Sequence, residues 1–255
     1  MIKLSVATHN ICHFGKDPVD HHELFPDHTY KNGYDADDVE EMIKRWKSVY
    51  GSFQADLVGL QEYCPQFDLT GMLSGPEIVF APYGYTVQAD EFTSPQGHKL
   101  AVASKHPVIP VWEKSFAPAS ERRADKFYID LSDGSDGSVT KTRRIAVFDC
   151  HPHPRFAEVR QQEYAQLVEE FRREETFIAF GDYNARTAEE YEIFRRAGYP
   201  MANGGDAGSI LTTETGSTCD NIIVSPDIRI TDVRVLDRDF TLSDHAILYA
   251  ELQIG

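Results

Sequence analysis

The chain has 255 residues, of which 41% are hydrophobic and 11% aromatic, so it can bury a substantial core and does not have the composition of a disordered chain. Its 41 acidic residues outnumber the 25 basic ones, and the formal net charge is -16 at pH 7. Such a surface argues against a protein that coats nucleic acid, because it repels phosphate backbones.

Apolar patterns predict the elements of the first half of the chain. A strand is expected at 2–8, followed by a helix at 35–53 whose apolar residues form one stripe, with Asp35 as its N-cap. A buried strand at 56–60 follows this helix and ends at Gln61-Glu62. Short strands punctuated by Gly and Pro are then expected at 84–89, 99–104, 107–112, 126–131 and 144–150.

The second half of the chain continues with helices at 156–173 and 188–197, the latter stopped by Gly198. The remaining strands are expected at 177–180, 220–224, 229–235 and 246–253. Strands outnumber helices and often follow one another directly, which favours two mostly antiparallel sheets packed face to face with helices outside. We therefore predict an α+β fold, an α/β/β/α four-layer sandwich, in place of a doubly wound parallel sheet.

No repeat, low-complexity tract or linker interrupts the chain, so we expect a single domain over residues 1–255. The N-terminus lacks a long apolar signal segment, and no stretch reaches membrane-spanning length. The four cysteines form no CxxC pair and fit buried thiols in a reducing compartment. A cytoplasmic protein without a membrane span is the expectation, and the sequence leaves the oligomeric state open.

Polar residues that can carry chemistry stand at or next to the ends of apolar strands. They are Asn10, Glu62, His151, Asp182, Asn184, Asp244 and His245. One polar strand end means little, because strand ends are usually polar. Several carboxylates, two imidazoles and two amides that converge at one sheet edge would, however, supply the groups that metal-assisted hydrolysis needs.

These residues lie in segments that resemble the endonuclease/exonuclease/phosphatase (deoxyribonuclease I-like) superfamily. The segments, in the order of that family, are Ala7-Thr8-His9-Asn10-Ile11, Asp56 to Glu62, Ala101 to Pro107, Asp149-Cys150-His151-Pro152, Phe180 to Ala185, Asp220-Asn221-Ile222-Ile223 and Ser243-Asp244-His245. The Gln-Glu, Gly-Asp-x-Asn and Ser-Asp-His motifs, each at a strand end, are the most specific part of the resemblance.

The resemblance implies a bound divalent cation, Mg²⁺ with Mn²⁺ as a second option. Glu62 resembles the glutamate that ligates the metal, and hard cations of this kind prefer carboxylate oxygens. Asn10 resembles the amide beside the metal, and Asp244 resembles a second metal or water ligand.

The resemblance also implies catalytic roles. Asp182 would orient or deprotonate the attacking water, and Asn184 would hold a phosphate oxygen. His245 would contact the scissile phosphate, with Asp220 fixing its imidazole. His151 would donate a proton to the leaving oxygen or stabilise the pentacoordinate phosphorus.

Candidate substrate-binding residues are His153, Lys99 and Arg144. His153 belongs to a His-Pro-His-Pro element, and the other two belong to a basic set that can grip a phosphate-rich ligand or simply form solvated strand faces. That set is Lys99, Lys105, Arg122, Arg123, Lys126, Lys141, Arg143 and Arg144. A histidine-rich segment at 13–28 can be an exposed loop, a lid or an extra transition-metal site.

The implied reaction is in-line attack of water on a phosphodiester or phosphomonoester, without a covalent intermediate. Exonuclease III-type members of the family carry a tryptophan shortly before the aspartate that Asp220 matches, and a tyrosine where this chain has the His151 region. Here the stretch before Asp220 is Gly216-Ser217-Thr218-Cys219, and His151 stands in place of the tyrosine, which disfavours an abasic-site endonuclease. The acidic charge favours a small-molecule or lipid-headgroup substrate, with nucleic acid possible but not favoured. A nuclease or end-processing phosphodiesterase is the first alternative, and a catalytically silent binding module of the same fold is the second.

Overall fold

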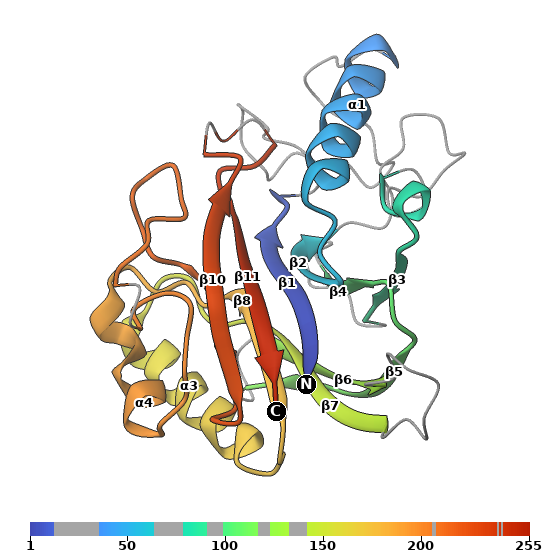
Figure 1. Ribbon diagram of the computed structural model, residues 1–255. Helices are drawn as coiled ribbons and strands as arrows, with labels where there is room; N and C mark the ends of the chain where they lie inside the picture. Colours follow the sequence, from blue (N-terminus) through green and yellow to red (C-terminus); the bar gives the residue numbers. More distant parts are fainter. Residues whose placement is uncertain are drawn as a thin grey trace.

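The structure, a computed structural model, describes nine segments of the chain. They are residues 1–12, 36–63, 79–90, 99–116, 123–132, 142–205, 208–238, 240 and 242–255. The histidine-rich segment at 13–28 lies outside them. Two β-sheets stack face to face, and the longer helices cover their outer faces (Figure 1). The predicted α/β/β/α sandwich is confirmed.

The first sheet has six strands in the order β10-β11-β1-β2-β4-β3. Their bounds are β10 Ile228–Leu236, β11 Ile247–Ile254, β1 Ile2–Asn10, β2 Leu57–Tyr63, β4 Lys99–Ser104 and β3 Thr86–Ala89. All neighbours are antiparallel except β1 and β2, which run parallel. Parallel neighbours need a crossover, and the helix α1 (Ala36–Phe53) lies within it.

The second sheet has five strands in the order β5-β6-β7-β8-β9. Their bounds are β5 Val108–Ser115, β6 Arg123–Ser132, β7 Thr142–His151, β8 Phe177–Asp182 and β9 Asp220–Val224. Here β7 and β8 form the parallel pair, joined through α3 (Ala157–Phe171). Each sheet is thus mostly antiparallel and contains one parallel pair with its own crossover helix.

Three short helices complete the described structure: η3 (Ala81–Tyr83), η4 (Ala188–Tyr191) and α4 (Glu192–Arg196). The single helix expected at 188–197 is instead a 3₁₀ turn followed by a short α-helix, and a bond from the Glu190 N–H to the Thr187 carbonyl tightens its start. Such 3₁₀ turns are common at the start of α-helices. None of the helices that the structure describes combines the length and apolar character needed to cross a membrane.

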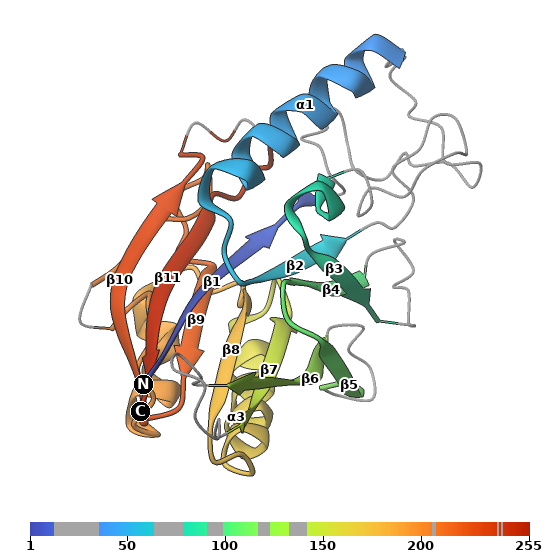
Figure 2. The same cartoon turned by 45° about the vertical axis from the view of Figure 1, so that its right-hand side comes forward.

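Three apolar clusters hold the four layers together. Trp46 and Tyr50 of α1 are fully buried against the outer face of the six-stranded sheet, and Tyr164 and Phe171 of α3 are buried against the five-stranded sheet. The two helices lie on opposite sides of the stacked sheets (Figure 2). The third cluster lies between the sheets. Central strands are therefore buried on both faces, which explains why they appear in the sequence as continuous apolar runs.

The two sheets approach closely where Gly59 of β2 faces Phe180 of β8. A Cβ atom at position 59 would lie 2.2 Å from the Phe180 ring, so a larger residue cannot fit without displacing the ring. The chain ends lie side by side at one end of the sandwich, since Ile2 pairs with Ile254 (Figures 1 and 2).

Towards the other end of the sandwich, the layer between the sheets becomes polar. The Thr8 hydroxyl donates to Gln61 Oε1 at 3.1 Å, and Gln61 Nε2 donates across the sheets to Asp149 Oδ1 at 2.6 Å. The other oxygen of Asp149 has no hydrogen-bond partner among the described residues, and Asp125 is buried opposite it on β6. Burial raises the pKa of Asp149 well above its ordinary value.

We expect Asp149→Asn to stabilise the protein at neutral pH and to change its stability little at about pH 4. The raised pKa means that the folded chain holds the proton more tightly than the unfolded chain. The stability that the carboxyl contributes is therefore complete below its unfolded pKa and is lost as the pH rises towards the folded pKa. Asparagine keeps the carbonyl oxygen that accepts from Gln61 but cannot ionise.

Denaturant unfolding of the two proteins at acidic and neutral pH measures this effect. The exposed Glu169→Gln substitution serves as a control for the loss of one surface carboxylate. A gain in the free energy of unfolding that is the same at both pH values would contradict the titration argument.

Candidate active site

The residues predicted from strand ends converge at the polar end of the sandwich. β1 and β2 bring Asn10 and Glu62, β7 and β8 bring His151 and Asp182, and the turn before β11 brings the last pair, Asp244 and His245. Both parallel pairs point their carboxyl ends at this edge, so one site receives side chains from both sheets.

Asp182 stands at the centre of the cluster and is 1% exposed. Its Oδ2 accepts a hydrogen bond from Asn10 Nδ2 at 3.0 Å, and the same oxygen lies 3.4 Å from His151 Nε2 and 3.8 Å from His245 Nε2. Burial alone would raise the pKa of Asp182, but the two imidazoles and the Asn10 amide outweigh burial and lower it. The Asp182 side chain is therefore an ionised carboxylate at neutral pH.

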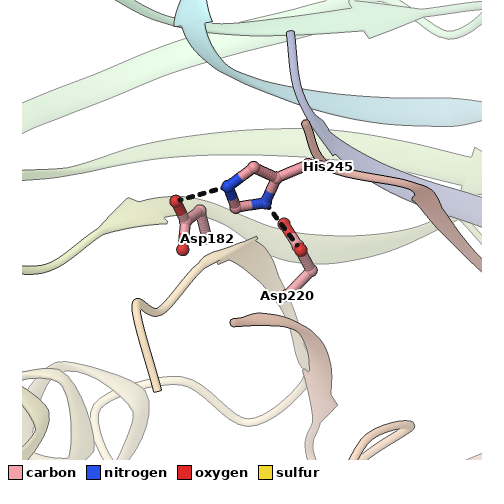
Figure 3. Close-up of side chains that lie close together, drawn as sticks. All are labelled: Asp182, Asp220 and His245. Carbon is pink, nitrogen blue, oxygen red and sulfur yellow. Dashed lines mark hydrogen bonds and ion pairs between the residues drawn. The ribbon is translucent and has the colours of Figure 1, made fainter. Parts of the chain in front are cut away.

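His245 lies between two carboxylates, as Figure 3 shows. Its Nδ1 is 2.9 Å from Asp220 Oδ2, on the side away from Asp182. Burial would lower the pKa of His245, but Asp220 and Asp182 raise it to about 10. At neutral pH the ring is an imidazolium whose two N–H groups face the two carboxylates.

The turn that carries His245 is anchored to the first sheet through Ser243. The Ser243 hydroxyl donates to the Asn10 carbonyl at 2.7 Å, and the same oxygen accepts from the His245 backbone N–H at 3.2 Å. Asp244 is half-buried, with Oδ1 3.3 Å from the Ser243 hydroxyl. The serine of the Ser-Asp-His motif thus joins the histidine to the end of β1.

Glu62 and Asn184 both adopt left-handed backbone conformations, with φ of 53° and 55°. Such values are unusual for residues with a side chain and cluster at functional sites. Glu62 lies in an irregularity of the β2–β4 pairing, and its Oε1 is 3.8 Å from His151 Nε2. The Asn184 N–H donates to Asp182 Oδ1 at 2.7 Å, and its side-chain amide donates to the Pro152 carbonyl at 2.9 Å.

Gly181 is required by the parallel pairing of β7 and β8. A Cβ atom at this position would lie 2.0 Å from the carbonyl oxygen of Cys150, and φ is 155°. No side-chain adjustment can relieve a clash with backbone. The glycine of the Gly-Asp motif therefore allows β8 to lie close enough to β7 for Asp182 to meet His151.

His9 is a site residue whose role the sequence did not indicate. It is fully buried on the outer face of β1, with Nδ1 2.8 Å from the Tyr50 hydroxyl and Nε2 3.1 Å from the His245 carbonyl. Burial lowers the pKa of His9 to about 3, with a further contribution from His245, so the ring is neutral. Its Nε2–H donates to His245 and its Nδ1 accepts from Tyr50, which links α1 to the His245 turn. In the sequence, the only sign of this contact was the aromatic residues, Tyr50 among them, in the apolar stripe of the helix predicted at 35–53.

The three candidate substrate-binding residues lie in different places. His153 follows His151 by two residues, and its Nδ1 accepts from the backbone N–H groups of Arg155 and Phe156 at 3.1 and 3.3 Å. Lys99 pairs in register with Tyr63, next to Glu62, and its Nζ donates to the Asp90 carbonyl at 2.7 Å.

Arg144 is not brought to the site. It lies seven residues before His151 on β7, roughly 23 Å away along an extended strand. Its guanidinium donates to both carboxylate oxygens of Asp130, at 2.9 Å each. Within the basic set, Lys126 and Arg143 are similarly paired, with Glu174 and Asp227. These pairs favour the view that this set mainly forms structural ion pairs on strand faces.

Two sets of residues near the cluster could hold a cation. Asp182, Asp220 and His245 have ligand atoms within 4.8 Å of one another. In this set, however, both ring nitrogens of His245 already face carboxylates, Nδ1 towards Asp220 and Nε2 towards Asp182, so the three residues form an ion-paired network. The carboxylate of Glu62, 21% exposed, with the Asn10 amide and Asp244, offers the oxygen donors that Mg²⁺ or Mn²⁺ prefers.

Comparison with known proteins matches this site to a family. The sequence model of the Endonuclease/Exonuclease/phosphatase family matches residues 7–245, which include every residue of the cluster. A search of curated proteins finds no match.

Solved structures share the fold at low sequence identity. The endonuclease/exonuclease/phosphatase from Bacteroides vulgatus is 14% identical, with a TM-score of 0.69 over 100% of both chains. The human Nocturnin catalytic domain with bound sulfate anion is 16% identical, with a TM-score of 0.65 over 99% of this chain and 94% of that one. D. rerio TDP2 complexed with single strand DNA product is 13% identical, with a TM-score of 0.62 over 98% and 99%.

We expect Gly181→Ala to lower the free energy of unfolding by more than about 3 kcal/mol, because both the backbone clash and the unfavourable φ must be relieved. Gly198→Ala is the matched control, since Gly198 also has a positive φ, of 82°, but a Cβ there meets no atom within 4 Å. That control should lose only about 1 kcal/mol. Equal losses in the two variants, measured by denaturant unfolding, would show that the β7–β8 approach does not require glycine.

Proposed function

The chain belongs to the endonuclease/exonuclease/phosphatase family, and we propose that it is a divalent-metal-dependent phosphoesterase that hydrolyses a phosphodiester or phosphomonoester. The observation that carries the proposal is the buried Asp182 carboxylate held between two imidazoles, with Asp220 behind His245. This arrangement combines a carboxylate base, a second imidazole and a fixed positive charge on His245 in one place.

Asp182 orients the attacking water and accepts its proton. Its Oδ1 is held by the Asn184 N–H and its Oδ2 by Asn10, so the carboxylate cannot rotate away from the substrate. A fixed base of this kind contributes through orientation as well as through proton transfer. Asn184 would hold a phosphate oxygen, and its side-chain amide is oriented by the hydrogen bond that it donates to the Pro152 carbonyl.

His245 stabilises the negative charge that develops on the phosphoryl oxygens. Its imidazolium is maintained by Asp220, which also holds the ring in one orientation through Nδ1. A preorganised cation in a buried site is worth more than one in water, because its dipolar surroundings need not rearrange during the reaction. His151, which is 5% exposed, protonates the leaving oxygen or stabilises the pentacoordinate phosphorus.

Glu62, Asn10 and Asp244 would hold the metal ion. When bound there, a divalent cation would supply positive charge to the phosphoester oxygens, which otherwise face a site rich in carboxylates. The protein residues supply the geometry: Asn10 is in register with Gln61 on the neighbouring strand, and Ser243 ties the Asp244 turn to the end of β1.

We favour a small-molecule or lipid-headgroup phosphoester as the substrate. The net charge of -16 opposes binding along a nucleic acid backbone, and several of the basic side chains in the middle of the chain already bind carboxylates. A nuclease or nucleic-acid end-processing phosphodiesterase is the second candidate, supported by the shared fold with D. rerio TDP2 complexed with single strand DNA product. A catalytically silent binding module is disfavoured because every motif carboxylate and imidazole is present.

Removal of divalent metal should abolish hydrolysis of bis(p-nitrophenyl) phosphate, and Mg²⁺ or Mn²⁺ should restore it. Glu62→Gln should raise the metal concentration for half-maximal rate by at least about tenfold, because an amide is a weaker ligand than a carboxylate. Glu158→Gln, an exposed carboxylate in the first turn of α3, is the control and should leave this concentration unchanged. A rate of hydrolysis that is unchanged in the presence of a chelator would contradict the metal-dependent mechanism.

Substitution of the Asp220–His245 pair should show that the two residues act as one unit. His245→Ala should lower kcat by roughly 10²- to 10⁴-fold, and Asp220→Asn should lower it less. The double variant should be no slower than His245→Ala alone, since Asp220 acts through the imidazole. Multiplicative losses in steady-state kinetics would instead mean that Asp220 has an independent role.

A further inference from the structure

The loops that follow β7 and β8 are joined by a buried ion pair. Arg160 of α3 is 1% exposed, and its Nε and one terminal nitrogen donate to Glu190 Oε2 at 3.0 and 2.6 Å. The other terminal nitrogen donates to the carbonyls of His153 and Pro154, both at 3.3 Å. The loop after His151 and the loop after Asp182 are therefore held as one rigid wall beside the site.

This wall fixes the backbone of Arg186, while none of its members binds the Arg186 side chain. The second oxygen of Glu190 accepts from the Arg186 N–H at 2.9 Å, and the preceding carbonyl, of Ala185, accepts from the Thr218 hydroxyl at 3.3 Å. Arg186 itself is exposed, and its guanidinium has no hydrogen-bond or ion-pair partner in the described part of the chain.

Arg186 lies in the loop that follows β8, the strand that ends with Asp182 of the candidate active site. It follows Asp182 by four residues and Asn184 by two, on a loop whose Ala185 carbonyl contacts Thr218 near Asp220. Its charge also reaches Cys219: burial raises the pKa of this thiol, Asp182 and Asp220 raise it further, and Arg186 opposes them. The Arg186 guanidinium therefore acts electrostatically on the same thiol, that of Cys219, as the two site carboxylates.

Acidic residues outnumber basic ones by 41 to 25, and Arg143, Arg144 and Arg160 are each bound to a carboxylate. Arg186 has no such partner among the described residues, so its charge is available to a ligand. A guanidinium on a rigid backbone beside a phosphoester site is suited to bind an oxyanion through two parallel hydrogen bonds.

We propose that Arg186 binds a second phosphate group of the substrate, next to the phosphoester that is cleaved. The inference rests on the proposed function and deepens it, because it names the class of substrate: a phosphoester that carries another phosphate nearby. The second phosphate can be the terminal phosphate of a small molecule or the next phosphate of a nucleic acid strand. Either one presents the same oxyanion to the guanidinium.

Two pairs of chromogenic substrates test the proposal. The nucleotide pair is thymidine 5′-(p-nitrophenyl phosphate) with and without a 3′-phosphate. The small-molecule pair is ethyl p-nitrophenyl phosphate with and without a terminal phosphate on the ethyl group. Within each pair the scissile bond and the reporter are the same, so only the additional phosphate differs.

Wild-type protein loaded with Mg²⁺ or Mn²⁺ should show a lower KM for the doubly phosphorylated member of at least one pair. Arg186→Gln should raise that KM by about tenfold, with kcat and the singly phosphorylated substrates changed less than about twofold. Arg186→Lys, which keeps the charge without the planar fork, should recover part of the loss. A preference confined to the nucleotide pair identifies a nucleic acid source, and a preference in the ethyl pair identifies a small molecule.

Arg229→Gln provides the matched control, because Arg229 is also exposed but lies on β10, paired with Gln253 at the opposite end of the sandwich. It should leave all four rates unchanged. If the wild-type protein hydrolyses the esters but Arg186→Gln changes the KM of both members of a pair equally, or of neither, the role of Arg186 is overturned and the proposed function stands. Failure of wild-type protein to cleave any of the four esters overturns both.

Discussion

A buried carboxylate is stable only where other groups compensate its charge, and Asp182 obtains this compensation from both sheets. Asn10 donates to it from β1, His151 approaches from β7 and His245 from the turn before β11. Each of these groups stands at the end of a different strand. The ionised state of Asp182 therefore depends on the correct stacking of the whole sandwich, and the site cannot form in either sheet alone.

The close approach of the backbones is what allows these side chains to meet. Gly59 faces the Phe180 ring between the sheets, and Gly181 lies against the Cys150 carbonyl within one sheet. The polar layer beneath the site, from Thr8 through Gln61 to Asp149, adds a hydrogen-bonded link across the same interface. On the outer face, His9 connects α1 to the His245 turn, so helix packing also bears on the position of the imidazolium.

The electrostatic character of the protein differs between its surface and its site. The surface excess of negative charge would keep phosphates away, and the cluster itself contains several carboxylates. The cationic form of His245 and a metal bound by Glu62 would reverse this field locally. The guanidinium of Arg186 would extend the favourable region beyond the scissile group. Substrates with concentrated negative charge would then be favoured over long uniform polyanions, which meet the acidic surface as well.

The sequence by itself determined that two sheets stack between helices, and it determined which strands end in polar residues. Whether a segment forms a strand or an amphipathic helix depends mainly on the pattern of residues that are close in sequence. The strands at 56–60 and 177–180 and the helix at 35–53 were therefore predictable. Glu62, Asp182 and His245 were found because family motifs place them at strand ends, which the structure brings to one edge.

Only the tertiary structure decided which side chains meet. Arg144 and His151 share one strand, yet the extended backbone puts them at opposite ends, and Arg144 binds Asp130 instead. Arg160 and Glu190 are 30 residues apart and leave no local pattern. Pairings of this kind follow from the packing of separate elements, because burial forces each charge to find a partner wherever the fold provides one. Periodicity reports which face of an element is buried but does not identify the residue across the interface.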